Sequence, residues 1–261
     1  MTRQKTLILR FSLIALTLFL SCGLLLSPGT MPATTSSKET VQNSPREVKI
    51  RVKNLTQSFT LVSLERKPGQ VVRLALRNDY RKSITAFALS PRNDRYVQRP
   101  DFLFSDDVIT PNETYVETCT IPELADRSSE MIEVIITVRA VVFDDGTSDG
   151  DGKMVERIKD TRLGKKIQIQ RIIPLLRNAL NSSSVQPEHA LSSLQMRIRD
   201  LSTSPQSGLS VYVKGGLHNA KEKVIQELKA LESRQMQDGY QHLQGAFAGI
   251  IDRYERILAK L

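Results

Sequence analysis

The chain of 261 residues contains no tryptophan, and the aromatic residues together make up only 5% of it. Proteins that hold single-stranded nucleic acids stack the bases on aromatic side chains. A sugar-binding shelf needs flat aromatic rings for the same reason. The shortage of aromatic residues therefore argues against both kinds of stacking site.

Cysteine is almost as scarce, with two residues, Cys22 and Cys119. Cys22 lies in an apolar N-terminal segment, which leaves Cys119 without a partner in the same chain. A protein that works outside the cytoplasm without a disulfide must be held together by its hydrophobic core. We expect Cys119 to be a small buried residue on a strand. A disulfide to another chain is the alternative.

The residue patterns of common catalytic sites are missing too. The three histidines, His189, His218 and His242, lie in the C-terminal half, and the chain has no HExxH motif and no G-x-S-x-G turn. We therefore predict that the protein is not an enzyme. The catalytic alternative is an unrecognised hydrolase, which needs a cleft that joins acidic residues such as Asp106 and Asp107 to the helices.

One long hydrophobic run is present at the N-terminus. Residues 7–26 read LILRFSLIALTLFLSCGLLL and follow Arg3 and Lys5. A basic N-terminus followed by an apolar run sends the downstream chain across a membrane. We assign residues 1–26 as a signal peptide or a transmembrane signal anchor. The bulk of the protein is then expected in the periplasm or at the cell surface, or secreted if the leader is cleaved.

The length of this leader leaves three alternatives open. The uninterrupted apolar stretch 11–26 is longer than the about 7–15 residues of a signal-peptide core and shorter than the ~20 that span a bilayer. Residues 18–22, LFLSC, also resemble a bacterial lipobox, which implies lipid attachment at Cys22, although Phe19 stands where a small aliphatic residue is usual. In all three cases the mature protein faces away from the cytoplasm.

Residues 27–45 differ in composition from both of their neighbours. They read SPGTMPATTSSKETVQNSP, rich in serine, threonine and proline, with almost nothing to bury. Such a composition does not form a packed core. We predict a disordered tether.

Residues 46–145 show a strand pattern. Apolar and polar residues alternate in 48–53, VKIRVK, again in 71–77, and over the longest stretch in 131–143. This period of two indicates half-buried antiparallel strands. About seven short strands separated by turn residues resemble an immunoglobulin-like or fibronectin-like β-sandwich. The resemblance implies an architecture and no activity.

An acidic, glycine-rich junction, residues 146–152, follows this pattern. Counted from Asp145, oxygen-bearing side chains recur with the spacing of a calcium-binding EF-hand loop; the candidate ligands are Asp145, Thr147, Asp149, Asp151 and Glu156. The alternative is a capped turn. In that case the glycines permit a tight connection, and Asp149 or Asp151 caps the next helix.

Residues 153–261 change to the helical period and become basic. This region carries eighteen Lys and Arg against ten Asp and Glu, whereas residues 47–152 carry fourteen against seventeen. We expect the first helix to stop at Gly164, and Pro174 to kink the second helix or begin a new one. A third helix is expected to begin near Pro187, and another helix follows the loop 202–210.

The last segment, Tyr240 to Leu261, has the most regular spacing in the chain. Its apolar side chains recur at intervals of three and four residues: Tyr240, Leu243, Phe247, Ile250, Tyr254, Ile257 and Leu261. This pattern predicts one face of a small helical bundle, with a homo-oligomeric coiled coil as the alternative. We expect the neighbouring Gly245 and Gly249 to permit close helix packing.

The fold class predicted from these patterns is α+β in two parts: an all-β sandwich followed by an all-α domain, after the hydrophobic leader. The positive charge of the helices is dispersed, apart from small groups at Arg162 with residues 165–166 and at Arg197 with Arg199. We predict no nucleic-acid partner.

The predicted protein is an exported or membrane-anchored component of the cell envelope. We expect it to act as a binding or scaffolding module, with a protein partner in the envelope and no cofactor apart from the calcium considered above. The alternative is a binder of anionic polymers or membrane surfaces that works through its basic helices.

Overall fold

The computed structural model describes residues 48–68, 70–91, 100–104, 108–121, 132–183, 187–204, 208–238 and 242–261. The predicted leader with Cys22, the tether 27–45 and the acidic pair Asp106 and Asp107 lie outside these residues. Within the described ranges, no helix combines the length and apolarity that a membrane crossing requires. Residues 45–261 group into one compact unit that contains both strands and helices, so the chain is a mixed α+β protein.

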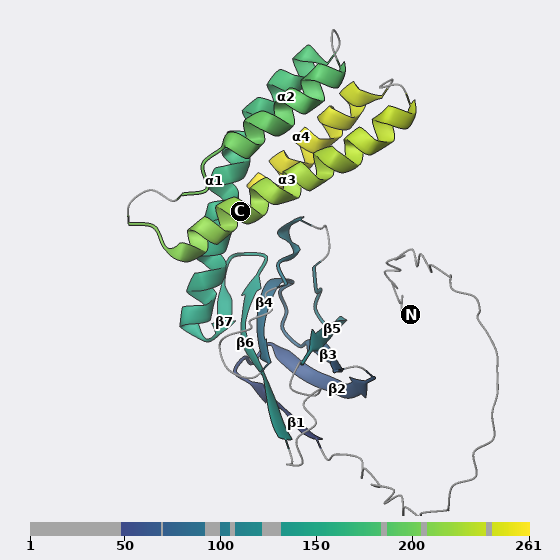
Figure 1. The fold of residues 1–261 in the computed structure, drawn as a ribbon. Helices are drawn as coiled ribbons and strands as arrows, with labels where there is room; N and C mark the ends of the chain where they lie inside the picture. Colours follow the sequence, from purple (N-terminus) through teal and green to yellow (C-terminus); the bar gives the residue numbers. More distant parts are fainter. Residues whose placement is uncertain are drawn as a thin grey trace, which may run out of the picture. The chain divides into compact units, whose positions relative to one another are not determined.

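In the part of the chain that the structure describes, seven strands form two sheets (Figure 1). Their bounds are β1 Val48–Asn54, β2 Phe59–Lys67, β3 Val71–Asn78, β4 Ile84–Pro91, β5 Thr114–Thr120, β6 Ile132–Phe143 and β7 Ser148–Gly150. One sheet has the order β1-β6-β4, with β7 also paired to β6, and the other has the order β2-β3-β5. All these pairs are antiparallel except β1 with β6, which run parallel.

The alternating apolar residues of both sheets meet in one core. The buried cluster takes Leu74 and Leu76 from β3, and Ile136 and Val138 from β6. Cys119 on β5 is fully buried in the same cluster, which confirms its predicted place on a strand. Burial raises the pKa of this thiol to about 12. The period of two was a reliable guide for β3 and β6, because these strands turn one face to the other sheet, whereas β2 has no second buried residue after Phe59.

The short strand β7 lies beyond the predicted end of the sandwich. Residues 148–150 pair with Ala140, Val141 and Val142 of β6, so this part of the acidic junction extends the sheet. Gly150 has a φ of +100°, and a Cβ atom at this position would lie 2.2 Å from the carbonyl oxygen of Arg139. Glycine is thus required here, because no other residue tolerates both the backbone angle and the contact.

Among the described residues, four α-helices and one 3₁₀ turn complete the fold. Their bounds are η1 Phe102–Phe104, α1 Gly152–Ser182, α2 Pro187–Asp200, α3 Val211–Asp238 and α4 Leu243–Lys260. The predicted stop at Gly164 and the predicted start of a new helix at Pro174 are both wrong, because α1 continues through these positions for 31 residues. Pro174 is exposed, while Ile172, Ile173 and Leu176 are buried. Packing of these neighbours compensates for the hydrogen bond that proline removes.

Gly164 lies inside α1, where it permits a close contact with α3. A Cβ atom on Gly164 would lie 2.1 Å from the carbonyl oxygen of Val213, and one on Gly216 would lie 2.0 Å from that of Thr161. Helices α1 and α3 therefore cross backbone to backbone. The predicted close-packing pair, Gly245 and Gly249, is wrong in this respect, since a Cβ at either position meets nothing within 4 Å.

The regular seam of the last segment faces the interior of the chain. Leu243, Phe247, Ile250, Tyr254 and Ile257 are all buried in a cluster shared with α1, α2 and α3. Tyr240 lies outside the described residues. This burial matches the bundle interpretation, because a coiled coil between protomers would use the same side chains.

Candidate functional site

The sheets and the helices meet along the first turns of α1. Met154, Val155 and Ile158 pack on small residues of β4 and β6, among them Ala86 and Ala140. Small side chains let the helix approach the sheet closely. The 3₁₀ turn η1 connects the same two layers, since Phe102 packs on the core between the sheets and Phe104 packs on the helical core.

A buried ion cluster lies at this junction. The Asp101 carboxylate accepts a hydrogen bond from Lys165 Nζ at 2.5 Å and another from Arg162 at 3.2 Å. Arg162 also donates to the hydroxyl of Thr85 on β4 at 3.0 Å, and Lys165 Nζ lies 4.9 Å from the ring centre of Phe104. These contacts connect residues more than sixty positions apart in the sequence. We call Asp101, Arg162 and Lys165 the junction cluster.

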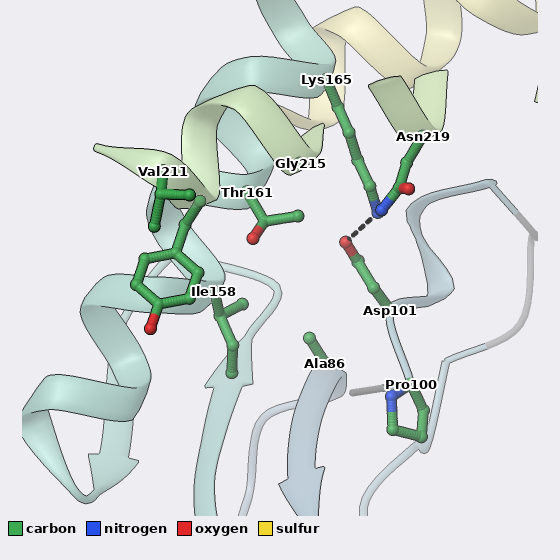
Figure 2. Close-up of a pocket in the computed structure, with 10 residues that line it drawn as sticks. Ala86, Pro100, Asp101, Ile158, Thr161, Lys165, Val211, Gly215 and Asn219 are labelled. Atoms are coloured by element: carbon green, nitrogen blue, oxygen red, sulfur yellow. Dashed lines mark hydrogen bonds and ion pairs between the residues drawn. The ribbon is translucent and has the colours of Figure 1, made fainter. Parts of the chain in front are cut away.

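One cavity, of about 370 Å³, lies beside the junction cluster (Figure 2). We call it the junction cavity. Lys165 and Asp101 form part of its wall, and Thr161 and Asn219 add a hydroxyl and an amide from α1 and α3. Figure 2 shows Lys165 and Asn219 reaching toward Asp101 from the helices. The rest of the wall includes apolar groups from Ala86, Pro100, Ile158 and Val211.

A second cavity, of about 630 Å³, also borders Arg162. We call it the basic groove. Among the described residues, its cations are Lys159, Arg162, Lys166 and Lys260, and its one acidic lining residue is Asp144. Lys159 and Lys166 form no ion pair with any residue that the structure describes. Apolar surface alternates with these charges and comes from Phe102, Val108, Val142, Phe143, Leu163 and Leu261.

The structure does not bring the predicted calcium ligands together. Asp145 forms an ion pair with Lys82 at 2.5 Å and accepts hydrogen bonds from the backbone and hydroxyl of Thr147. These contacts, led by the one from Lys82, lower the pKa of Asp145 to about 2. Glu156 lies on an exposed position of α1. Among the described residues, no group of three or more His, Cys, Asp or Glu side chains is placed to hold a metal ion.

The other two predicted ligands are held by the protein itself. Asp149 accepts hydrogen bonds from the backbone N–H groups of Gln57 and Ser58, at 2.7 and 3.0 Å, and from the Ser58 hydroxyl at 2.7 Å. Asp151 caps α1 by accepting from the N–H groups of residues 153 and 154, and it pairs with Arg139. These contacts correspond to the capped-turn alternative.

The histidines take no part in the cavities at the sheet–helix junction. His189, His218 and His242 are all exposed. His189 lines a separate cavity of about 510 Å³ between α1 and α2, together with Arg197 and the amide of Asn178. None of the described residues that line that cavity is acidic. The histidines therefore offer no metal or acid–base constellation in this part of the chain.

Sequence reasoning grouped Arg162 with Lys165 and Lys166 as surface charge and did not find the junction cluster. One signal was available, because Lys165 lies on the same helix face as Ile158, Ile169 and Ile172, which are buried. A lysine within an apolar stripe needs a partner. The identity of that partner, Asp101, could not be read from the sequence.

Searches against protein-family models, curated proteins and solved structures find no match to this chain. The functional argument therefore depends on the geometry of the junction.

Proposed function

We propose that the protein is a binding module of the cell envelope, exported or anchored through its leader, that engages acidic lipid headgroups in its basic groove. The observation that carries this proposal is the pair of lysines, Lys159 and Lys166, that line the groove without an ion-pair partner among the described residues. We further propose that the two sheets form an immunoglobulin-like sandwich that supports the groove. One shared core between the sheets supports that interpretation.

The charges of the groove favour an anionic partner. Lys159 and Lys166 lie on either side of Arg162, about one turn away along α1, so the three cations follow one face of the helix. On an ordinary solvated helix surface, a cation is neutralised by a neighbouring acid, as Arg177 is by Glu255. Among the described residues of the groove wall, Asp144 is the one acid. Arg162 is already paired with Asp101, so Lys159 and Lys166 are the cations that an entering anion could contact without displacing an ion pair of a described residue.

The apolar surface of the groove favours a lipid over a fully hydrophilic polymer. Aromatic and aliphatic groups from Phe102, Phe143 and Leu163 lie between the cations. An acidic lipid offers phosphate oxygens to the lysines and hydrocarbon to these side chains. A hydrophilic polyanion would leave the apolar surface in water, and it is the second candidate.

The test measures binding to vesicles by the compact unit, residues 45–261, so that the hydrophobic leader does not contribute. Co-sedimentation with vesicles that contain acidic phospholipid is compared with neutral vesicles, at low and raised salt. We expect binding only to the acidic vesicles, and weaker binding at raised salt because ions screen the charges. The double variant Lys159→Glu/Lys166→Glu should abolish it.

The control variant is Lys223→Glu/Lys229→Glu. These exposed lysines of α3 do not line the groove, and the variant changes the net charge equally. Equal losses from the two double variants would mean that overall charge decides binding, and the groove proposal would then be rejected. Binding to soluble polyanions without binding to vesicles would favour the polymer candidate.

Scaffolding without a ligand in the groove is the remaining interpretation of this fold. It predicts that neither acidic vesicles nor polyanions bind. A hydrolase is not proposed, because the acidic residues it was expected to use, Asp106 and Asp107, lie outside the described residues.

A further inference from the structure

We propose that the junction cavity is a separate binding site for a small monocarboxylate with a short apolar tail. The site is distinct from the basic groove, because its ligand would lie in the junction cavity, whose described wall includes Lys165 and Asp101 and not Arg162. Three observations carry the inference: the unused hydrogen-bond donors of Lys165, the charge balance of the junction cluster, and the polarity of the cavity wall.

The donors of Lys165 exceed the acceptors that the protein supplies. Lys165 is only 6% exposed, and its ammonium group carries three N–H donors. Asp101 accepts one of them, and the ring of Phe104 lies near the ammonium. No other described residue accepts a hydrogen bond from it. Buried donors without acceptors are costly, so the site favours a molecule that brings acceptors.

The charges of the junction cluster do not cancel. Among the described residues, the single carboxylate of Asp101 contacts two cations, Arg162 and Lys165. All three side chains are at most 13% exposed, so water screens the excess positive charge poorly. A ligand with one negative charge would bring the net charge of the junction cluster to zero. A doubly charged anion would leave the cluster with a net negative charge. The charge balance therefore selects a monoanion.

The wall of the cavity indicates the form of that monoanion. Thr161 donates its hydroxyl to the carbonyl oxygen of Arg157 at 2.8 Å, while the amide of Asn219 forms no hydrogen bond with any residue that the structure describes and offers N–H donors. A carboxylate has two oxygens, one for Lys165 and one for Asn219. Ile158 and Val211 give the remainder of the ligand an apolar environment. The volume of about 370 Å³ lies near the lower end of ordinary ligand sites and restricts the tail to a small one.

The experiment titrates the full chain with butyrate and with benzoate, followed by calorimetry and by the shift in melting temperature. Butyramide and benzamide, which have the same shape without the charge, are the matched controls. We expect the carboxylates to bind and to raise the melting temperature, and the amides to bind at least about tenfold more weakly, since a charge-assisted hydrogen bond is lost.

Two variants test the location of the site independently. Lys165→Met removes the charge and keeps much of the side-chain volume; it should weaken carboxylate binding at least about tenfold. Because Lys165 is buried, this variant can also fail to fold. Val211→Trp avoids that problem: Val211 is 70% exposed at the cavity wall, and the larger ring should block the cavity without disturbing the core.

Lys159→Met is the control, because Lys159 lines the basic groove and not the junction cavity. It should bind carboxylates as the unmodified chain does and lose affinity only for acidic vesicles. Failure of both carboxylates to bind, equal binding of the amides, or unchanged binding by folded Lys165→Met or Val211→Trp would each overturn the proposal. The vesicle experiment is unaffected by any of these outcomes.

Discussion

The sheets and the helices of this protein are positioned by different kinds of contact. In the β region, polar side chains fix the turns: Asn78 donates to the carbonyl oxygens of Lys82 and Ile109, and Asp149 holds residues 57–58. In the helical region, apolar stripes supply the core, and the crossing at Gly164 and Gly216 sets how closely α1 and α3 approach. Hydrogen bonds from polar side chains thus fix the turns of the β region, and steric fit fixes the crossing of α1 and α3 in the helical region.

The largest effect is expected from a methyl group added where α1 and α3 cross. We expect Gly164→Ala to lower the free energy of unfolding by about 3 kcal/mol or more, because its Cβ would meet the backbone of Val213, which cannot move aside like a side chain. Denaturant titration followed by circular dichroism measures the change.

Gly245→Ala is the matched control for that substitution. The position is helical and open, so alanine should stabilise the protein by up to about 1 kcal/mol through its higher helix propensity. Similar destabilisation by both variants would show that the crossing is not special.

A smaller effect is expected from the β region. Asp149→Ala removes the acceptor of three hydrogen bonds from Gln57 and Ser58, two of them from backbone N–H groups. We expect the free energy of unfolding to fall by about 2 kcal/mol, because these donors then lose their hydrogen bonds to a charged acceptor. Asp144→Ala, in the same acidic segment, should change the free energy of unfolding by less than about 0.5 kcal/mol. Equal effects of the two substitutions would contradict the assigned role of Asp149.

Alkaline pH should weaken the β region through Cys119. Its folded pKa of about 12 lies above the ordinary value of 9.0, so the folded state keeps the proton while the unfolded state loses it. Stability from this group is complete below about pH 9 and is lost as the pH rises toward 12; about 1.4 kcal/mol is lost at pH 10, one unit above the unfolded pKa. Denaturant titrations of the unmodified chain and Cys119→Ala should therefore converge as the pH rises. Parallel curves would contradict this linkage.

The smallest effect is expected from calcium. The carboxylates of Asp145, Asp149 and Asp151 already accept hydrogen bonds from the protein. We expect about 5 mM calcium, a concentration above the ~10⁻⁴–10⁻³ M dissociation constants of extracellular calcium modules, to leave the melting temperature unchanged. A rise that Asp149→Ala abolishes would instead support the calcium loop.

Elements with a periodic pattern of apolar residues could be predicted from the sequence, whereas individual contacts between distant residues could not. Alternation located β3 and β6, and the three-and-four spacing located the buried face of α4, because burial on one face repeats along an element. Gly164 was misread because a glycine that ends a helix and a glycine that admits another helix have the same local sequence signal. Asp101 and Lys165 meet across 64 positions, and nothing local marks such a pair.

The parallel pairing of β1 with β6 has a mechanical consequence. Val48 lies opposite Ile132, and the register continues to Asn54 opposite Val138. The chain enters at the first residue of β1, and β6 leads on through β7 into α1. A force that pulls the N-terminus away from the helices therefore draws the two strands past each other along their length. Seven residue pairs share that load in shear, instead of separating one after another, so the β region should resist tension applied through its N-terminus.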